Sequence, residues 1–143
     1  MRIFLDASVL FSAAKSAGAI QLLLHALHAA GHSLVADEYV ATEARRNVDA
    51  KAGRDAAAYL QALLSRIEVS TVHHATIAQA DVLWLAQKDR PVLMAAIGLA
   101  CDVLVTGDRT HFGPGYGMVF DGVSIYAPVQ LAQLVFPLAQ ASP

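Results

Sequence analysis

Apolar residues along the chain alternate between short continuous runs and sets spaced by three or four positions. The short runs are rich in β-branched residues and leucine and predict strands, at residues 2–6, 32–36, 67–69 and 102–106. The spaced sets predict helices at residues 18–30, 54–65 and 75–87, and after Asp37, Pro91 and Pro128. A loop at 113–117 and short extended pieces at 118–120 and 123–125 precede the last helix. This alternation predicts an α/β, three-layer sandwich with a mainly parallel central sheet flanked by helices.

The composition is compatible with one compact domain covering residues 1–143. Hydrophobic residues make up 56% of the chain and charged residues 15%, which fits helices packed on both faces of a sheet and an oligomer interface such as a homodimer. Polar residues interrupt every apolar run before it could cross a bilayer, and the N-terminus lacks the pattern of a signal peptide. Cys101 is the single cysteine, so we expect a cytoplasmic protein with no membrane association and no disulfide.

Four carboxylates fall where a parallel sheet would bring them together. Asp6 and Asp108 follow two apolar strands, Glu43 lies in the first turns of the helix after the second strand, and Asp89 precedes the helix that feeds the strongest strand. Strand ends and the starts of the following helices share one edge of such a sheet, which is where ligands bind. We therefore expect the four carboxylates to converge at that edge.

Clustered carboxylates repel one another and are tolerated when a cation compensates their charge. Hard oxygen ligands without cysteine favour Mg²⁺ or Mn²⁺ over Zn²⁺. Such a cation activates water and stabilises the charge that develops on a phosphate, which predicts an in-line displacement at phosphorus. The competing interpretation is that each carboxylate only caps a helix.

The residues around these carboxylates resemble a known family. Four segments together are similar to a PIN domain, and most of all to small prokaryotic VapC-type toxins. They are Leu5-Asp6-Ala7-Ser8-Val9-Leu10, Ala41-Thr42-Glu43-Ala44-Arg45-Arg46, Lys88-Asp89-Arg90-Pro91 and Val105-Thr106-Gly107-Asp108. The resemblance extends over essentially the whole chain.

That resemblance implies a metal-dependent endoribonuclease that acts on an RNA substrate, paired with an antitoxin protein. It assigns Asp6, Glu43, Asp89 and Asp108 as the catalytic, metal-binding quartet, with Asp6 and Asp108 as the most direct ligands. It also implies that Ser8 and Thr106 support the first and last acids. Where some relatives carry a further acid after Asp108, this chain has Thr110 and His111.

Basic residues flank the candidate acids. Arg45 and Arg46 follow Glu43, and Arg109 follows Asp108, so these arginines are candidates for binding RNA phosphates. Ordinary surface ion pairs are the alternative. His111 is a candidate for an acid–base step.

Two other functions remain open from the sequence. A small-molecule metal-dependent phosphohydrolase that forms an aspartyl phosphate needs a second Asp two residues after the nucleophile, where this chain has Ser8. A catalytically silent RNA- or protein-binding module is the other alternative, and the intact carboxylates count against it.

Overall fold

The computed structural model describes residues 1–72 and 80–138, and its central feature is a six-stranded sheet. The strand order is β3-β2-β1-β4-β6-β5, and every neighbouring pair is parallel except β5 and β6. The strands are β1 (Arg2–Leu5), β2 (Ser33–Asp37), β3 (Glu68–Ser70), β4 (Val103–Val105), β5 (Val119–Phe120) and β6 (Val123–Tyr126). The helices are α1 (Ala7–Lys15), α2 (Ala19–Ala29), α3 (Glu38–Lys51), α4 (Gly53–Arg66), α5 (Arg90–Gly98), α6 (Arg109–Phe112) and α7 (Pro128–Val135).

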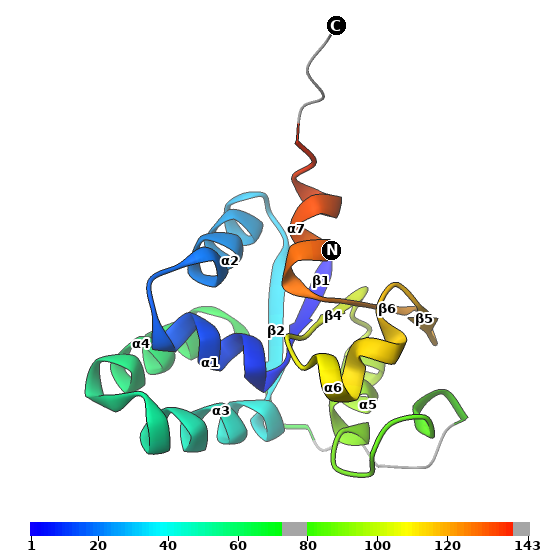
Figure 1. Ribbon diagram of the computed structural model, residues 1–143, viewed down its shortest axis with the longest axis horizontal. Helices are drawn as coiled ribbons and strands as arrows, with labels where there is room; N and C mark the ends of the chain where they lie inside the picture. Colours follow the sequence, from blue (N-terminus) through cyan, green and yellow to red (C-terminus); the bar gives the residue numbers. More distant parts are fainter. Residues whose placement is uncertain (73–79, 139–143) are drawn as a thin grey trace, which may run out of the picture.

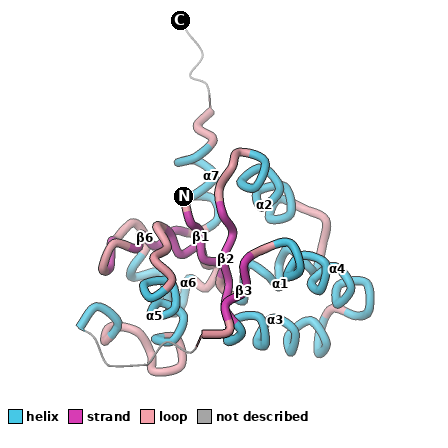
Figure 2. Tube along the Cα trace, turned by 180° about the vertical axis from the view of Figure 1, so that it is seen from behind, coloured by secondary structure: helices cyan, strands magenta, loops and turns pink. Residues whose placement is uncertain are grey.

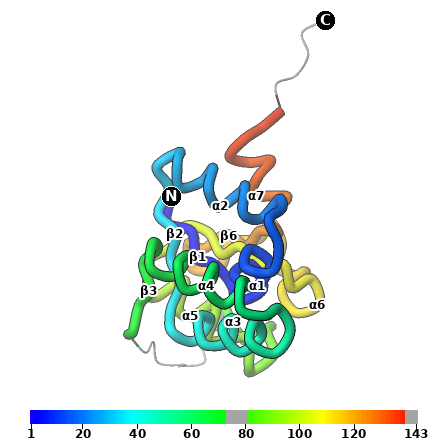
Figure 3. The backbone as a smooth tube through the Cα atoms, turned by 90° about the vertical axis from the view of Figure 1, so that its left-hand side faces the viewer, coloured from blue at the N-terminus to red at the C-terminus, as the bar shows by residue number. Residues whose placement is uncertain are grey.

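The helices lie on both sides of the sheet, as the alternating pattern predicts. Helices α1 to α4 gather on one side of β1 and β2, and α5 and α6 lie on the other, with α7 beyond the N-terminal end of β1 (Figure 1; Figure 2 shows the same arrangement from behind). Seen from the side, α7 lies next to α2 (Figure 3). The predicted α/β fold with a mainly parallel sheet is therefore confirmed.

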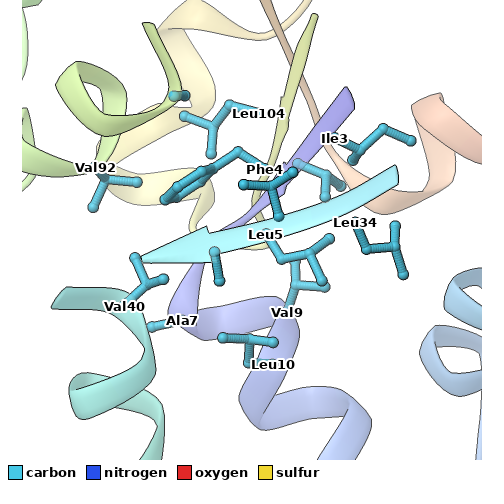
Figure 4. Packing of buried hydrophobic residues seen from close by; sticks show 14 of the residues in the cluster. Ile3, Phe4, Leu5, Ala7, Val9, Leu10, Leu34, Val40, Val92 and Leu104 are labelled. Atoms are coloured by element: carbon cyan, nitrogen blue, oxygen red, sulfur yellow. The ribbon is translucent and has the colours of Figure 1, made fainter. Parts of the chain in front are cut away.

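The core is centred on β1, which pairs with β2 on one side and β4 on the other. Ile3, Phe4 and Leu5 are completely buried because helices cover both faces of this strand. Figure 4 shows the ring of Phe4 pointing toward Val92 of α5, at the centre of this cluster. Because Ile3, Phe4 and Leu5 are held in the core, the position of Asp6, the next residue, is fixed.

Two parts of the predicted element pattern are wrong. The sequence pattern missed α1, which begins directly after Asp6 instead of after a loop. Of the predicted helix over 75–87, residues 75–79 lie outside the described residues, and the rest contains only the 3₁₀ turn η1 (Ala80–Val82). The guanidinium of Arg90 donates hydrogen bonds to the carbonyl oxygens of Leu85 (3.0 Å) and Leu83 (3.4 Å). These bonds satisfy carbonyl groups that would otherwise pair within a helix.

No helix in residues 1–72 and 80–138 is long and apolar enough by itself to span a membrane. Helices α1 and α2 meet that length and composition only as a pair bent by 111°.

Candidate active site

Aspartates stand where strands give way to helices along one edge of the sheet. Asp6 joins β1 to α1, Asp37 joins β2 to α3, and Asp108 follows β4 and begins α6. Each accepts a hydrogen bond from a backbone N–H at the start of its helix, from Ala7 (2.8 Å), Val40 (3.1 Å) and His111 (3.2 Å). Capping therefore explains part of why acids occupy these positions.

Asp6 has more partners than capping requires. Its Oδ2 accepts hydrogen bonds from the hydroxyl groups of Thr106 (2.7 Å) and Ser8 (3.2 Å). Thr106 is completely buried, and its Oγ1 also accepts a bond from the backbone N–H of Asp108 (3.1 Å). Ser8 Oγ accepts a further bond from Gly107 N (3.0 Å). The hydroxyl of Thr106 thus links the side chain of Asp6 to the backbone N–H of Asp108, and these two aspartates follow neighbouring strands.

Burial disfavours the ionised form of Asp6. The side chain is 5% exposed, and its desolvation raises the pKa of Asp6 from 3.8 to about 6. The hydrogen bonds from Thr106, Ala7 and Ser8 act in the opposite direction, and the negative charge of Glu43 adds to the rise. A carboxylate in this state is stabilised by any cation placed nearby.

A second cluster joins Asp89, Asp108 and His111. Ligand atoms of these three half-buried residues all lie within 4.8 Å of one another. His111 Nδ1 lies 2.7 Å from Asp108 Oδ2. Asp89 occupies the position before α5 but makes no capping bond, and its Oδ2 is buried with no hydrogen-bond partner among the described residues. Burial raises the pKa of Asp89, whereas the charge of His111 lowers it. An unpartnered carboxylate oxygen beside a second carboxylate fits a cation.

Tyr39 connects Glu43 to this second cluster. Burial raises the pKa of Tyr39, and the negative charges of Glu43 and Asp89 raise it further, so this ring lies near both acids. Its hydroxyl donates a hydrogen bond to the carbonyl oxygen of Lys88 (2.7 Å). Tyr39 therefore holds α3, which carries exposed Glu43, against the segment that carries Asp89.

The three candidate arginines are exposed and differ in their surroundings. Arg45 forms an ion pair with Glu38 (3.2 Å), which is the alternative that the sequence left open for it. The charge of Arg46 lowers the pKa of Tyr39, and that of Arg109 lowers the pKa of Tyr116, so both lie near the acids. Arg46 and Arg109 thus remain the stronger candidates for a phosphate contact.

The sequence missed two tyrosines. Tyr39 falls in the helix predicted after Asp37 and Tyr116 in the loop predicted at 113–117, and neither is among the candidate site residues, yet the Tyr116 hydroxyl donates to the carbonyl oxygen of Thr106 (2.8 Å). A tyrosine that follows three glycine or proline residues in the 113–117 segment could have signalled a loop anchored by a side chain. The preceding residue, Gly115, packs against Trp84, where a Cβ would lie 2.5 Å from Cη2 of that ring.

The predicted quartet is thus divided between two neighbouring clusters. Asp89 and Asp108 lie together with His111, whereas Asp6 lies within the influence of Glu43 and is linked to Asp108 through Thr106. Among the described residues, no group of three potential ligands this close includes Asp6 or Glu43. The donor set at the second cluster, two carboxylates and an imidazole, fits a divalent cation.

Comparisons with known proteins agree with this geometry. A family model described as a PIN domain matches residues 2–110. No match was found among curated proteins. Similar solved structures include VapBC2 from Rickettsia felis bound to a promoter DNA fragment (17% identity, TM-score 0.62, 89% of this chain and 98% of that one). They also include Mycobacterium tuberculosis VapC20, a sarcin-ricin loop cleaving toxin (15% identity, TM-score 0.57, 82% of this chain and 98% of that one). A third is VapBC-1 from nontypeable Haemophilus influenzae (13% identity, TM-score 0.61, 90% of this chain and 99% of that one). At these identities the structures establish a shared fold.

Proposed function

The chain belongs to the PIN-domain family, and from that membership and its acidic edge we propose that it is an endoribonuclease dependent on Mg²⁺ or Mn²⁺. The observation that carries the proposal is the meeting of Asp89, Asp108 and His111 beside an unpartnered buried oxygen of Asp89. Helix capping alone does not account for that oxygen, since Asp89 makes no capping bond.

Each part of the site has a distinct role in this proposal. Asp89 and Asp108 would hold the cation, with Asp6 and Glu43 completing the negative site. When bound, a divalent cation supplies activation of water and stabilises the charge that develops on the scissile phosphate.

The chain's own residues prepare the site for that chemistry. Thr106 and Ser8 donate hydrogen bonds that keep Asp6 oriented and favour its ionised form. Tyr39 fixes the segment carrying Asp89. Arg46 and Arg109, exposed near the acids, would bind phosphates of the RNA strand and position it across the edge of the sheet.

We also propose that the protein is the toxin of a toxin–antitoxin pair, acts in the cytoplasm and forms a homodimer. Support for the toxin and its antitoxin partner comes from the similar structures, one of which is described as a sarcin-ricin loop cleaving toxin and two as VapBC proteins.

Cleavage of a mixed RNA pool tests the catalytic proposal. Purified protein is incubated with Mg²⁺ or Mn²⁺ beside Asp6→Asn and Asp108→Asn, with Asp121→Asn as the matched control. Asp121 is exposed in the turn between β5 and β6, at a positive φ of 48° that Asn also tolerates. Cation-dependent cutting by the wild type and the control, lost in both site variants, is expected. Cutting that survives both substitutions contradicts the assigned site, and no cutting by any protein leaves a binding module.

A further inference from the structure

We propose that His111 is itself a ligand of the divalent cation, so that the site combines carboxylate oxygens with an imidazole nitrogen. The inference rests on the proposed function, because it assigns a role within the same site. It goes beyond the four acids implied by the sequence resemblance, where His111 was a candidate for acid–base chemistry only.

The first support is the position of the imidazole. His111 lies in the first turn of α6, where its backbone N–H is bonded to Asp108 Oδ1. The next residue, Phe112, is buried and packs edge-on against the ring of Trp84, with centroids 6.4 Å apart. The backbone on either side of the imidazole is therefore held, and its nitrogen is presented to Asp108 at 2.7 Å without a further change of the fold.

The second support is the oxygen of Asp89. An imidazole that only oriented Asp108 would need no third group, yet Asp89 presents a ligand atom within 4.8 Å of both partners. The Oδ2 of Asp89 is buried and makes no hydrogen bond to any described residue. A buried acceptor without a donor is destabilising unless something positive satisfies it. A cation shared by all three side chains meets that requirement.

The donor set has a consequence for metal preference. Mg²⁺ strongly prefers oxygen ligands, whereas an imidazole nitrogen suits Mn²⁺ better and the later transition metals better still. This chain should therefore bind Mn²⁺ more tightly relative to Mg²⁺ than a variant with oxygen at position 111. His111→Asp supplies that oxygen, and His111→Asn removes the imidazole but keeps an amide N–H that can donate to Asp108 in the cation-free protein.

The test uses the full chain loaded with Mn²⁺ and reads metal coordination directly. Pulsed electron paramagnetic resonance detects a ¹⁴N nucleus bound to Mn²⁺, and titration calorimetry measures Mn²⁺ and Mg²⁺ affinities. His25→Asn is the matched control, since His25 is exposed on α2. We expect a nitrogen signal in the wild type and in the control and its loss in both His111 variants. We also expect Mn²⁺ affinity to fall at least about tenfold in His111→Asn, and the Mn²⁺ to Mg²⁺ preference to fall in His111→Asp.

The outcomes separate this inference from the proposed function. Mn²⁺ bound by the wild type without a nitrogen signal overturns the role of His111 and leaves a cation-dependent nuclease intact. A nitrogen signal that persists in His111→Asn likewise overturns it, because another nitrogen is then the ligand. Failure of the folded wild type to bind Mn²⁺ at all overturns both. Circular dichroism of each variant establishes that it is folded before any loss of binding is interpreted.

Discussion

Thr106→Val tests whether one buried hydroxyl keeps Asp6 ionised. Valine has nearly the same shape, so the change removes the 2.7 Å hydrogen bond to Asp6 Oδ2 while the buried volume is preserved. A hydrogen bond to a charged acceptor contributes about 1.5–3 kcal/mol, which corresponds to about 1–2 pKa units. Starting from a pKa of about 6, Asp6 in the variant should titrate near pH 7 to 8. At pH 7 its ionised fraction would fall from roughly nine-tenths to between about a half and a tenth.

The assay is a carbon-detected nuclear magnetic resonance titration of the aspartate carboxyl groups in cation-free protein. The resonance of Asp6 is assigned by its absence in Asp6→Asn. Thr106→Ser is the control, because it keeps the hydroxyl and loses only a methyl group. The pKa of Asp6 should rise in Thr106→Val and stay near the wild-type value in Thr106→Ser. An Asp6 pKa that moves by less than about half a unit in Thr106→Val refutes the assigned role of this hydroxyl.

Three further outcomes are expected. Because the folded-state pKa of Asp6 lies above its ordinary value of 3.8, its contribution favours folding at low pH and is lost as pH rises from about 4 through about 6. Urea unfolding of cation-free protein should therefore show Asp6→Asn gaining up to about 3 kcal/mol over the wild type between pH 4 and 8, and parallel profiles would contradict this. Tyr39→Phe removes the hydroxyl that holds α3 to the segment before α5. RNA cleavage should therefore slow several-fold, while the free energy of unfolding changes by less than about 1 kcal/mol. An unchanged cleavage rate would show that this hydrogen bond is dispensable. Gly115→Ala places a Cβ against the ring of Trp84 and should destabilise the fold by about 1–3 kcal/mol. Unfolding is followed by the fluorescence of this single tryptophan. Gly113→Ala, whose Cβ would meet nothing closer than 4.0 Å, is the control, and equal stabilities of the two variants would disprove the clash.

The local hydrophobic pattern was sufficient to predict the strands that precede Asp6 and Asp108. Apolar strands that end in Asp6 and Asp108 are visible in sequence because burial on both faces requires continuous apolar runs. The helix predicted after Asp37 is confirmed on the same local grounds, and the Asp37 side chain caps it by accepting a bond from the Val40 N–H. These features depend on neighbours along the chain.

Features that depend on distant residues were not predictable in the same way. In the described part of the helix predicted before Arg90, carbonyl groups five and seven residues back accept bonds from the Arg90 guanidinium instead of from helical N–H groups. The link between Tyr39 and the segment of Asp89 spans 49 residues, and the bond from Thr106 to Asp6 spans 100. Which acids share a cation is set by such tertiary contacts, so the assignment of the quartet to one site stays a prediction.

The chemistry of the RNA ends tests the central claim most directly. Hydrolysis by water activated at a cation site leaves 5′-phosphate and 3′-hydroxyl ends, whereas attack by the neighbouring 2′-hydroxyl leaves a 2′,3′-cyclic phosphate. Products of the purified protein are analysed with Mn²⁺, with Mg²⁺ and with a chelator. The account predicts 5′-phosphate ends that form only with a divalent cation and vanish in Asp108→Asn. Cyclic phosphate ends that persist in the chelator would contradict it.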